Sequence, residues 1–259
     1  MGAIIAGASL SSSNKSNPNK QTTLSCDAVA SKMSETKSES PDFKLLANNN
    51  RDRCSGNAEF VLQEGIGQHQ TSSSTEEYSK ALALFNKAIS LNPERAAAYY
   101  WRGSALDSLE NYQEALEDFS KSIDLDPKDY LSYHRRALIK YYDLNKSQEA
   151  LYDINQAIEL IPQDSDTESK ARLHDLRANI QMDLKDYERA LADANLSISL
   201  DNNDRYSYRT RSYIKSWLED GQGVCQDLRK AKELGLTEVS FGEDKNDSID
   251  HHINEWCEL

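Results

Sequence analysis

One short pattern recurs five times along this chain of 259 residues, and its spacing limits the possible folds more than any other feature. Four copies pair a small residue with a large apolar one and begin at Ala81, Ala115, Ala150 and Ala190, and a degenerate fifth copy begins at Val224. The steps between these residues are 34, 35, 40 and 34 positions. A period near 34 residues with two short amphipathic segments predicts an all-α stack of helical hairpins, because no single copy can bury its apolar face alone. We expect the extra residue of the third copy, near Asn145, to lie between helices, where insertions cost little.

The unit resembles the tetratricopeptide repeat in its order of small and large residues. In the second copy these residues are Tyr99, Gly103, Leu106, Tyr112, Ala115, Phe119, Ser122, Leu125 and Pro127. The resemblance covers residues 57–235, about five copies, although the fifth lacks the second-helix tyrosine and the proline. It implies a right-handed superhelical solenoid of ten antiparallel helices, without strands, that serves as a non-enzymatic protein-binding scaffold.

Composition divides the chain into three parts. Residues 1–56 are rich in Ser and Asn and have no apolar periodicity, so we expect a disordered leader. The segment Ala6-Gly7-Ala8 resembles a signal-peptidase site, which leaves open a remnant of an export signal. Residues 57–235 are the repeat array, and 236–259 form an acidic tail. In this tail Ile249, Ile253 and Trp256 share one helical face and suggest a capping helix.

Charge and cysteine usage bear on partners and compartment. The formal net charge of −13 argues against nucleic acid as a partner, because binding its backbone requires clustered Lys and Arg. No stretch approaches the ~20 apolar residues of a membrane helix, so no stable membrane insertion is expected of the chain as given. The cysteines Cys26, Cys54, Cys225 and Cys257 lie far apart, which favours free thiols and a reducing compartment. We therefore expect a cytoplasmic protein, or an exported or periplasmic one if the N-terminus is a truncated signal.

No catalytic or metal-binding motif is present in the sequence. His251-His252 is the nearest approach to a metal site, but adjacent residues point to different helix faces, and a solvated tail is expected. We therefore predict no cofactor, no metal and no enzymatic activity. A second periodicity places arginines 102, 136, 177 and 211 in step with aspartates 118, 153, 193 and 227. We interpret these as exposed ion pairs at the hairpin junctions, each contributing at most ~1 kcal/mol.

The resemblance implies a concave groove formed by the first helix of each hairpin. Carried over by register, its lining is Tyr100, Ser104, His134, Leu138, Tyr141, Arg172, Asn179, Arg209, Tyr213 and Trp217. Aromatics with arginines suit a peptide or protein segment that bears apolar anchors and a carboxylate. An alternative is that some aromatics, especially Tyr142 and Trp217, pack at hairpin ends instead.

The heat-shock carboxylate clamp of the family is disfavoured. Ile66, Trp101 and Leu131 stand where its polar residues would be, and only Arg135 agrees. The leading hypothesis is an adaptor with a protein or peptide partner. The alternatives are a self-associating structural or assembly factor and, less favoured, an accessory subunit of an enzyme.

Overall fold

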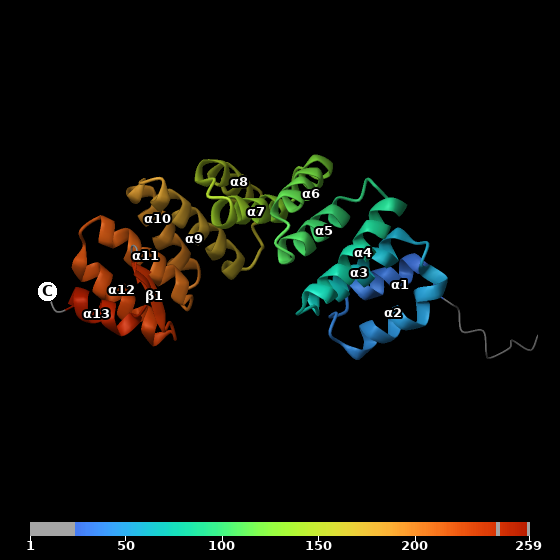
Figure 1. The fold of residues 1–259 in the computed structure, drawn as a ribbon, viewed down its shortest axis with the longest axis horizontal. Coiled ribbons are helices and arrows are strands. Elements are labelled where there is room, and N and C mark those ends of the chain that lie inside the picture. Colours follow the sequence, from blue (N-terminus) through green and yellow to red (C-terminus); the bar gives the residue numbers. More distant parts are fainter. Residues whose placement is uncertain (1–23, 242–243, 258–259) are drawn as a thin grey trace, which may run out of the picture.

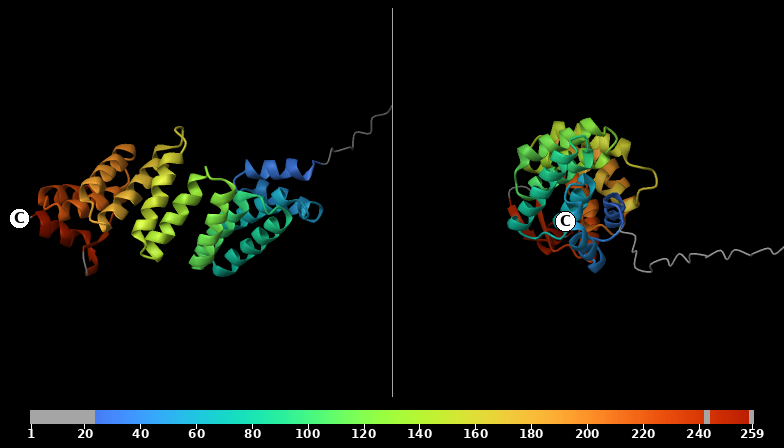
Figure 2. Two further views of the ribbon diagram at one scale, coloured as in Figure 1. Left: turned by 90° about the horizontal axis from the view of Figure 1, so that it is seen from above. Right: turned by 90° about the vertical axis from the view of Figure 1, so that its right-hand side faces the viewer.

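The protein is an elongated stack of helical hairpins, as the repeat predicts (Figure 1). The structure is a computed structural model that describes residues 24–241 and 244–257. Ten α-helices within residues 57–235 form five antiparallel hairpins: α3 (Ala58–Gln70) with α4 (Thr75–Leu91), α5 (Ala96–Ser108) with α6 (Tyr112–Leu125), α7 (Tyr130–Leu138) with α8 (Ser147–Leu160), α9 (Thr167–Asp183) with α10 (Tyr187–Leu200), and α11 (Arg205–Trp217) with α12 (Gly221–Glu233). Figure 2 shows the hairpins side by side along the long axis, with the first and last helices at opposite ends. We call the first helix of each hairpin its A helix and the second its B helix.

Small residues occupy the positions where the two helices of a hairpin approach most closely. At Gly103 of α5, an added Cβ would lie 3.1 Å from the ring of Phe119 and 3.3 Å from the carbonyl oxygen of Ala115. Ala115 and Phe119 of α6 are fully buried. The absence of a side chain at Gly103 therefore lets the two helices pack closely, while Phe119 fills the space beside them.

The third hairpin accommodates its extra residue in an unexpected place. The insertion does not lengthen the connection near Asn145; it lies in a π-helix, η1 (Ile139–Asp143), that directly continues α7. Asn145 and Glu110 both have positive φ, at 52° and 61°, and occupy the same place in their turns. Asn145 follows Ala137 by eight positions, whereas Glu110 follows Gly103 by seven. A π-turn absorbs one residue within a helix, so the turn that follows keeps its geometry.

Four of the hairpins carry an ion pair between their two helices. The guanidinium of an A-helix arginine donates two hydrogen bonds of 2.6–2.9 Å to a B-helix aspartate, in the pairs Arg102–Asp118, Arg136–Asp153, Arg177–Asp193 and Arg211–Asp227. Each arginine also donates to the preceding B helix, at Asn86, Ser120, Asn155 and Asn195 respectively. Each guanidinium therefore links neighbouring hairpins as well as the two helices of one. The predicted pairs are present, but the expectation that they are exposed is wrong, because the aspartate side chains are only 0–7% exposed.

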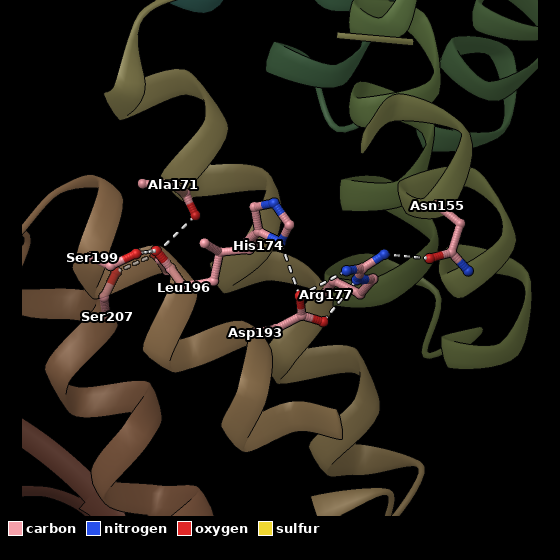
Figure 3. Close-up of polar contacts among 9 residues, drawn as sticks. Asn155, Ala171, His174, Arg177, Asp193, Leu196, Ser199 and Ser207 are labelled. Carbon is pink, nitrogen blue, oxygen red and sulfur yellow. Dashed lines mark hydrogen bonds and ion pairs between the residues drawn. The ribbon is translucent and has the colours of Figure 1, made fainter. Parts of the chain in front are cut away.

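The fourth hairpin adds a histidine to this arrangement, as Figure 3 shows. His174 Nδ1 lies 2.9 Å from an oxygen of Asp193, which also binds Arg177. Burial by itself raises the pKa of Asp193, but the hydrogen bonds from His174 and Arg177 outweigh it and hold the pKa below its usual value. Asp193 is therefore a buried carboxylate whose charge is fully compensated.

Residues 24–56 are folded, so the expectation of a disordered leader is wrong for this part of the chain. They form α1 (Cys26–Ser34) and α2 (Pro41–Cys54), which pack on α3. Val29, Met33 and Phe43 from these helices are buried in one apolar cluster with Phe60 of α3. The possible export-signal remnant lies outside the described residues.

The four cysteines form two disulfides, so the expectation of free thiols is wrong. Cys26 is bonded to Cys54, and Cys225 to Cys257. The partners are 28 and 32 residues apart in sequence, but folding brings their Cα atoms to 5.4 and 5.3 Å. Each disulfide ties a terminal helix to the element beside it.

The C-terminal part contributes a small β-hairpin and a last helix. Strands β1 (Glu238–Phe241) and β2 (Asp244–Ser248) pair antiparallel and lead into α13 (Ile249–Cys257). Ile249, Ile253 and Trp256 of α13 pack in one cluster with Leu228 of α12, so the helix lies over the apolar end of the last hairpin. His252 is only 4% exposed, and the expectation of a solvated tail is therefore wrong for this residue.

Candidate binding groove

The A helices of the second to fifth hairpins line one groove of about 780 Å³. It lies along the stack, so its walls come from segments that are far apart in the sequence. The side chains that matter below are Tyr100, Leu131, His134, Arg135, Leu138, Tyr142, Arg172, Asp175, Tyr206 and Arg209. A concave, partly apolar surface of this size with a few polar groups is the usual form of a ligand site in proteins.

Half of the ten residues predicted from the sequence line this groove, and half do not. The residues that line it are Tyr100, His134, Leu138, Arg172 and Arg209. The residues that lie elsewhere are Ser104, Tyr141, Asn179, Tyr213 and Trp217. Five of the predicted residues therefore border the groove, and the other five lie on the same hairpins but face elsewhere.

Packing explains why most of these five are not on the groove surface. Ser104 and Asn179 are only 3% and 9% exposed and belong to the helix contacts beneath it. The hydroxyl of Tyr141 donates to the carbonyl oxygen of Asn179 at 3.3 Å, which turns Tyr141 toward α9. Trp217 is 63% exposed, but its ring stacks on Tyr187 at the hairpin end, with centroids 5.8 Å apart and planes 8° from parallel. The alternative of packing at a hairpin end is thus the better description of Trp217.

Tyr142, the other aromatic residue of that alternative, lines the groove and is 58% exposed. It lies in η1, and its ring contacts that of Tyr141 edge-on with centroids 4.7 Å apart. The π-turn changes the angular position of the residues after it, so Tyr141 faces α9 while Tyr142 faces the groove. The 35-residue step between Ala115 and Ala150 was the only trace of this in the sequence.

Tyr130 and Arg205 also line the groove, although the sequence analysis missed them. They are the first residues of α7 and α11 and occupy equivalent repeat positions, because each precedes the small residue of its helix, Ala137 or Ser212, by seven positions. Extending the register one turn toward the start of each A helix would have found both.

Burial displaces the pKa values of several groove side chains, among them His134 and Asp175. Burial, with the nearby Arg135 and Arg172, lowers the pKa of His134 to about 4, so this imidazole is neutral near pH 7. Burial, with a smaller effect of Asp204, raises the pKa of Asp175 to about 6, while Thr210, Arg209 and Asn179 counteract it in part. One oxygen of Asp175 accepts from Asn179 Nδ2 at 3.2 Å, and the other is buried without a hydrogen-bond partner. Perturbed groups of this kind are concentrated at functional sites.

The groove is lined by four arginines, at positions 135, 172, 205 and 209, and by four carboxylates, at positions 168, 175, 201 and 204. Arg135 and Arg209 make no ion pair within the described part of the chain, and Arg209 Nε is buried without a hydrogen-bond partner. The guanidinium of Arg209 lies over the rings of Tyr206 and Tyr213, at 5.1 and 6.0 Å from their centroids. In contrast, Asp204 accepts from the backbone nitrogens of Tyr206 and Ser207 and caps α11. The groove therefore has positive charge available on a chain that is acidic as a whole.

Within the described residues, no group of three or more His, Cys, Asp or Glu side chains is placed to hold a metal ion. In residues 24–241 and 244–257, no helix is both long and apolar enough to cross a bilayer.

Comparison with known proteins identifies the repeat. Two profiles, both described as tetratricopeptide repeat, match residues 74–130 and 171–204. No curated protein matches the chain in sequence.

Several solved structures share the fold. YrrB, described as a TPR protein with an unusual peptide-binding site, is 18% identical, with 73% of this chain and 91% of that one covered and a TM-score of 0.59. MamA from Desulfovibrio magneticus RS-1 is 16% identical, with coverage of 68% and 94% and a TM-score of 0.60. PilF of Pseudomonas aeruginosa is 16% identical, with coverage of 72% and 79% and a TM-score of 0.60. At these identities the likeness concerns the fold alone. The matched segments and the five hairpins identify the chain as a tetratricopeptide repeat protein.

Proposed function

We propose that the protein is a non-enzymatic interaction scaffold whose groove binds an extended or helical segment of another protein. The observation that carries this proposal is the groove itself, which presents exposed aromatic rings beside arginines without ion pairs. Tyr142 and Tyr206 are 58% and 43% exposed and line the same groove, so a partner that fills the groove would cover both rings. YrrB, which shares the fold, is described as having a peptide-binding site.

The charges of the groove favour a segment with a carboxylate. Arg135 and Arg209 make no ion pair in the described structure, whereas Asp204 is occupied by capping α11. A guanidinium can form two parallel hydrogen bonds with a carboxylate, which gives direction as well as affinity. We therefore expect a ligand with apolar or aromatic anchors near Tyr142 and an acidic side chain or chain terminus near Arg209.

A peptide selection tests this proposal. The purified protein is used to select binders from a random displayed-peptide library, and the affinity of a selected synthetic peptide is then measured by calorimetry. We expect Tyr142→Ala and Arg209→Ala each to weaken binding about tenfold or more, equivalent to about 1.4 kcal/mol, because aromatic and arginine side chains dominate interface energies.

Tyr152→Ala is the matched control. Tyr152 is as exposed as Tyr142, at 61%, but lies on the B helix α8 and does not line the groove. The proposal is overturned if no peptide is selected, or if the affinity depends on Tyr152 as strongly as on Tyr142.

We further infer that the protein works in an oxidising compartment, the exported alternative of the sequence analysis. The support is the pairing of all four cysteines, since disulfides persist mainly outside the cytosol. Alkylation of thiols in intact source cells before lysis, followed by mass spectrometry of the cysteine peptides, tests this. Four alkylated cysteines would contradict it.

A further inference from the structure

The two disulfides lie at opposite ends of the stack and have different surroundings. Cys26–Cys54 joins the first residue of α1 to the last residue of α2. Cys225–Cys257 joins the middle of α12 to the last residue of α13. The difference matters because the chemistry of a disulfide depends on how well each sulfur is stabilised as a thiolate and on which sulfur can be reached.

Cys26 is placed where a negative charge on sulfur is stabilised. It is the first residue of α1, at the positive end of the helix dipole, after the N-cap Ser25. Nη1 of Arg53 lies 3.5 Å from Cys26 Sγ and donates toward it. Nη2 of Arg53 lies 2.6 Å from Asn50 Oδ1, which holds the guanidinium in position. Helix N-termini and neighbouring arginines are two of the features that activate cysteines.

Asp27, which follows Cys26 in the sequence and is the one acidic residue in the first turn of α1, is an opposing charge. One oxygen of its carboxylate accepts a hydrogen bond of 2.8 Å from Asn57 Nδ2, at the start of α3. Arg53, in contrast, donates directly toward the sulfur. The direct contact and the helix N-terminus therefore outweigh Asp27 at Cys26.

Accessibility divides the roles of the two sulfurs in this pair. Cys54 is only 1% exposed, while Cys26 is partly exposed at the surface. An incoming thiolate can therefore reach Cys26 but not Cys54. In the reduced form, Cys26 would be the attacking thiolate and Cys54 the buried thiol that resolves the mixed disulfide.

The second disulfide also has one partly exposed sulfur, that of Cys257, but neither of its cysteines lies at the start of a helix. Cys257 ends α13, where the helix dipole disfavours a thiolate, and Cys225 is the fifth residue of α12 and only 8% exposed. The chain thus contains its own matched control, a second disulfide with a comparable sequence separation of 32 residues against 28.

We propose that Cys26 and Cys54 form a redox-active pair that undergoes thiol–disulfide exchange with dithiols, whereas Cys225–Cys257 is a structural crosslink. A thiolate of the dithiol bonds to Cys26 Sγ, the Cys26–Cys54 bond breaks, and its electron pair leaves on Cys54, which takes up a proton. The second thiol of the reductant then loses its proton and attacks the reductant's own sulfur in the mixed disulfide. Cys26 leaves as a thiolate beside Arg53, and the reductant becomes a disulfide. Two electrons have moved from the dithiol to the protein, and the reverse sequence oxidises the pair.

Exchange at this site would act on the N-terminal end of the stack. Val29 and Met33 of α1 pack against Phe60 of α3, and the disulfide is the covalent tie between α1 and α2. Reduction would therefore loosen α1 from the first hairpin and leave the groove, formed by later hairpins, intact.

The experiment compares the two disulfides in the full-length oxidised protein. The protein is exposed to dithiothreitol for increasing times, the free thiols are trapped with iodoacetamide, and each cysteine peptide is quantified by mass spectrometry. We expect Cys26 and Cys54 to be reduced about tenfold faster, or more, than Cys225 and Cys257. Equal rates, a faster second pair, or alkylation of all four residues without reductant would each overturn the proposal.

A pair of charge variants tests the cause. In fully reduced protein, the rate of Cys26 alkylation against pH should have a midpoint below that of an unperturbed thiol, and Arg53→Met should raise this midpoint. Lys44→Met removes the same charge from an exposed position near the start of α2 and should leave the midpoint unchanged. A purely structural disulfide predicts no difference between these two variants, and that result would refute the role of Arg53.

Discussion

Replacing Asp175 by asparagine should stabilise the protein, although the change removes a charge from a polar groove. The carboxylate is largely buried on α9 and forms no ion pair with any residue that the structure describes. One of its oxygens is buried without a hydrogen-bond partner. The Asp175→Asn side chain would keep the shape of the protonated acid and would not have to carry a charge there.

The magnitude follows from the pKa of Asp175. Burial raises it from an ordinary value of 3.8 to about 6. At 1.36 kcal/mol per pKa unit, this difference corresponds to about 3 kcal/mol of destabilisation when the group is ionised in the folded state. Because the side chain borders the groove and retains some contact with water, we expect a gain of about 1–3 kcal/mol for the variant at neutral pH.

The pH dependence gives this prediction its sign. Below about pH 4 the carboxyl group is neutral in both states, so wild type and variant should have similar free energies of unfolding. As pH rises from about 4 through 6, the unfolded chain loses its proton first and the wild type loses stability. His134 acts in the opposite direction, since its pKa is lowered from 6.5 to about 4 and its neutral folded form gains stability over the same interval. The difference between variant and wild type removes this second contribution and isolates Asp175.

Urea denaturation followed by circular dichroism, at several values between about pH 4.5 and 8, measures this difference. Asp124→Asn is the control, because Asp124 is an exposed carboxylate on α6 and should give little difference at any pH. An Asp175→Asn difference that is constant with pH, or that shows the wild type to be the more stable protein above pH 6, would refute the reasoning.

Three further changes test the stack itself. Arg102→Ala leaves the Asp118 carboxylate, which is only 7% exposed, without its guanidinium, so the free energy of unfolding should fall by about 2–4 kcal/mol in urea denaturation, and by less for Arg102→Lys. Ala115→Leu places a larger side chain at a position that is 0% exposed between α5 and α6 and should cost about 1–3 kcal/mol, whereas an unchanged melting midpoint would contradict the assigned register. Deletion of residues 247–259 uncovers the apolar end of the last hairpin, so the melting midpoint should fall or light scattering should detect association. A truncated protein as stable and as monomeric as the full chain would show that α13 is not a cap.

The features that repeat locally could be predicted from the sequence. The 34-residue period specifies the order of the hairpins. Within each unit, the apolar residues that recur every three or four positions mark the two helices and their boundaries. The Arg102–Asp118 pair and its equivalents follow for the same reason, since they recur at one position in each unit. The A helices, which the register predicts as the walls of a groove, supply most of the residues that line the groove described above.

Features that occur once depended on the tertiary structure. Helices α1 and α2 have few apolar residues, and these become a core only when the first hairpin offers Phe60 as a surface to pack on. The disulfides could not be inferred, because only the folded chain brings residues 28 and 32 positions apart within bonding distance. Tyr142 lines the groove and lies in a π-turn, whereas Trp217 lies outside the groove and stacks on Tyr187 of another helix. The repeated sequence thus determines the scaffold of stacked hairpins. Contacts between distant segments determine the two ends, with their disulfides, and the irregular turns.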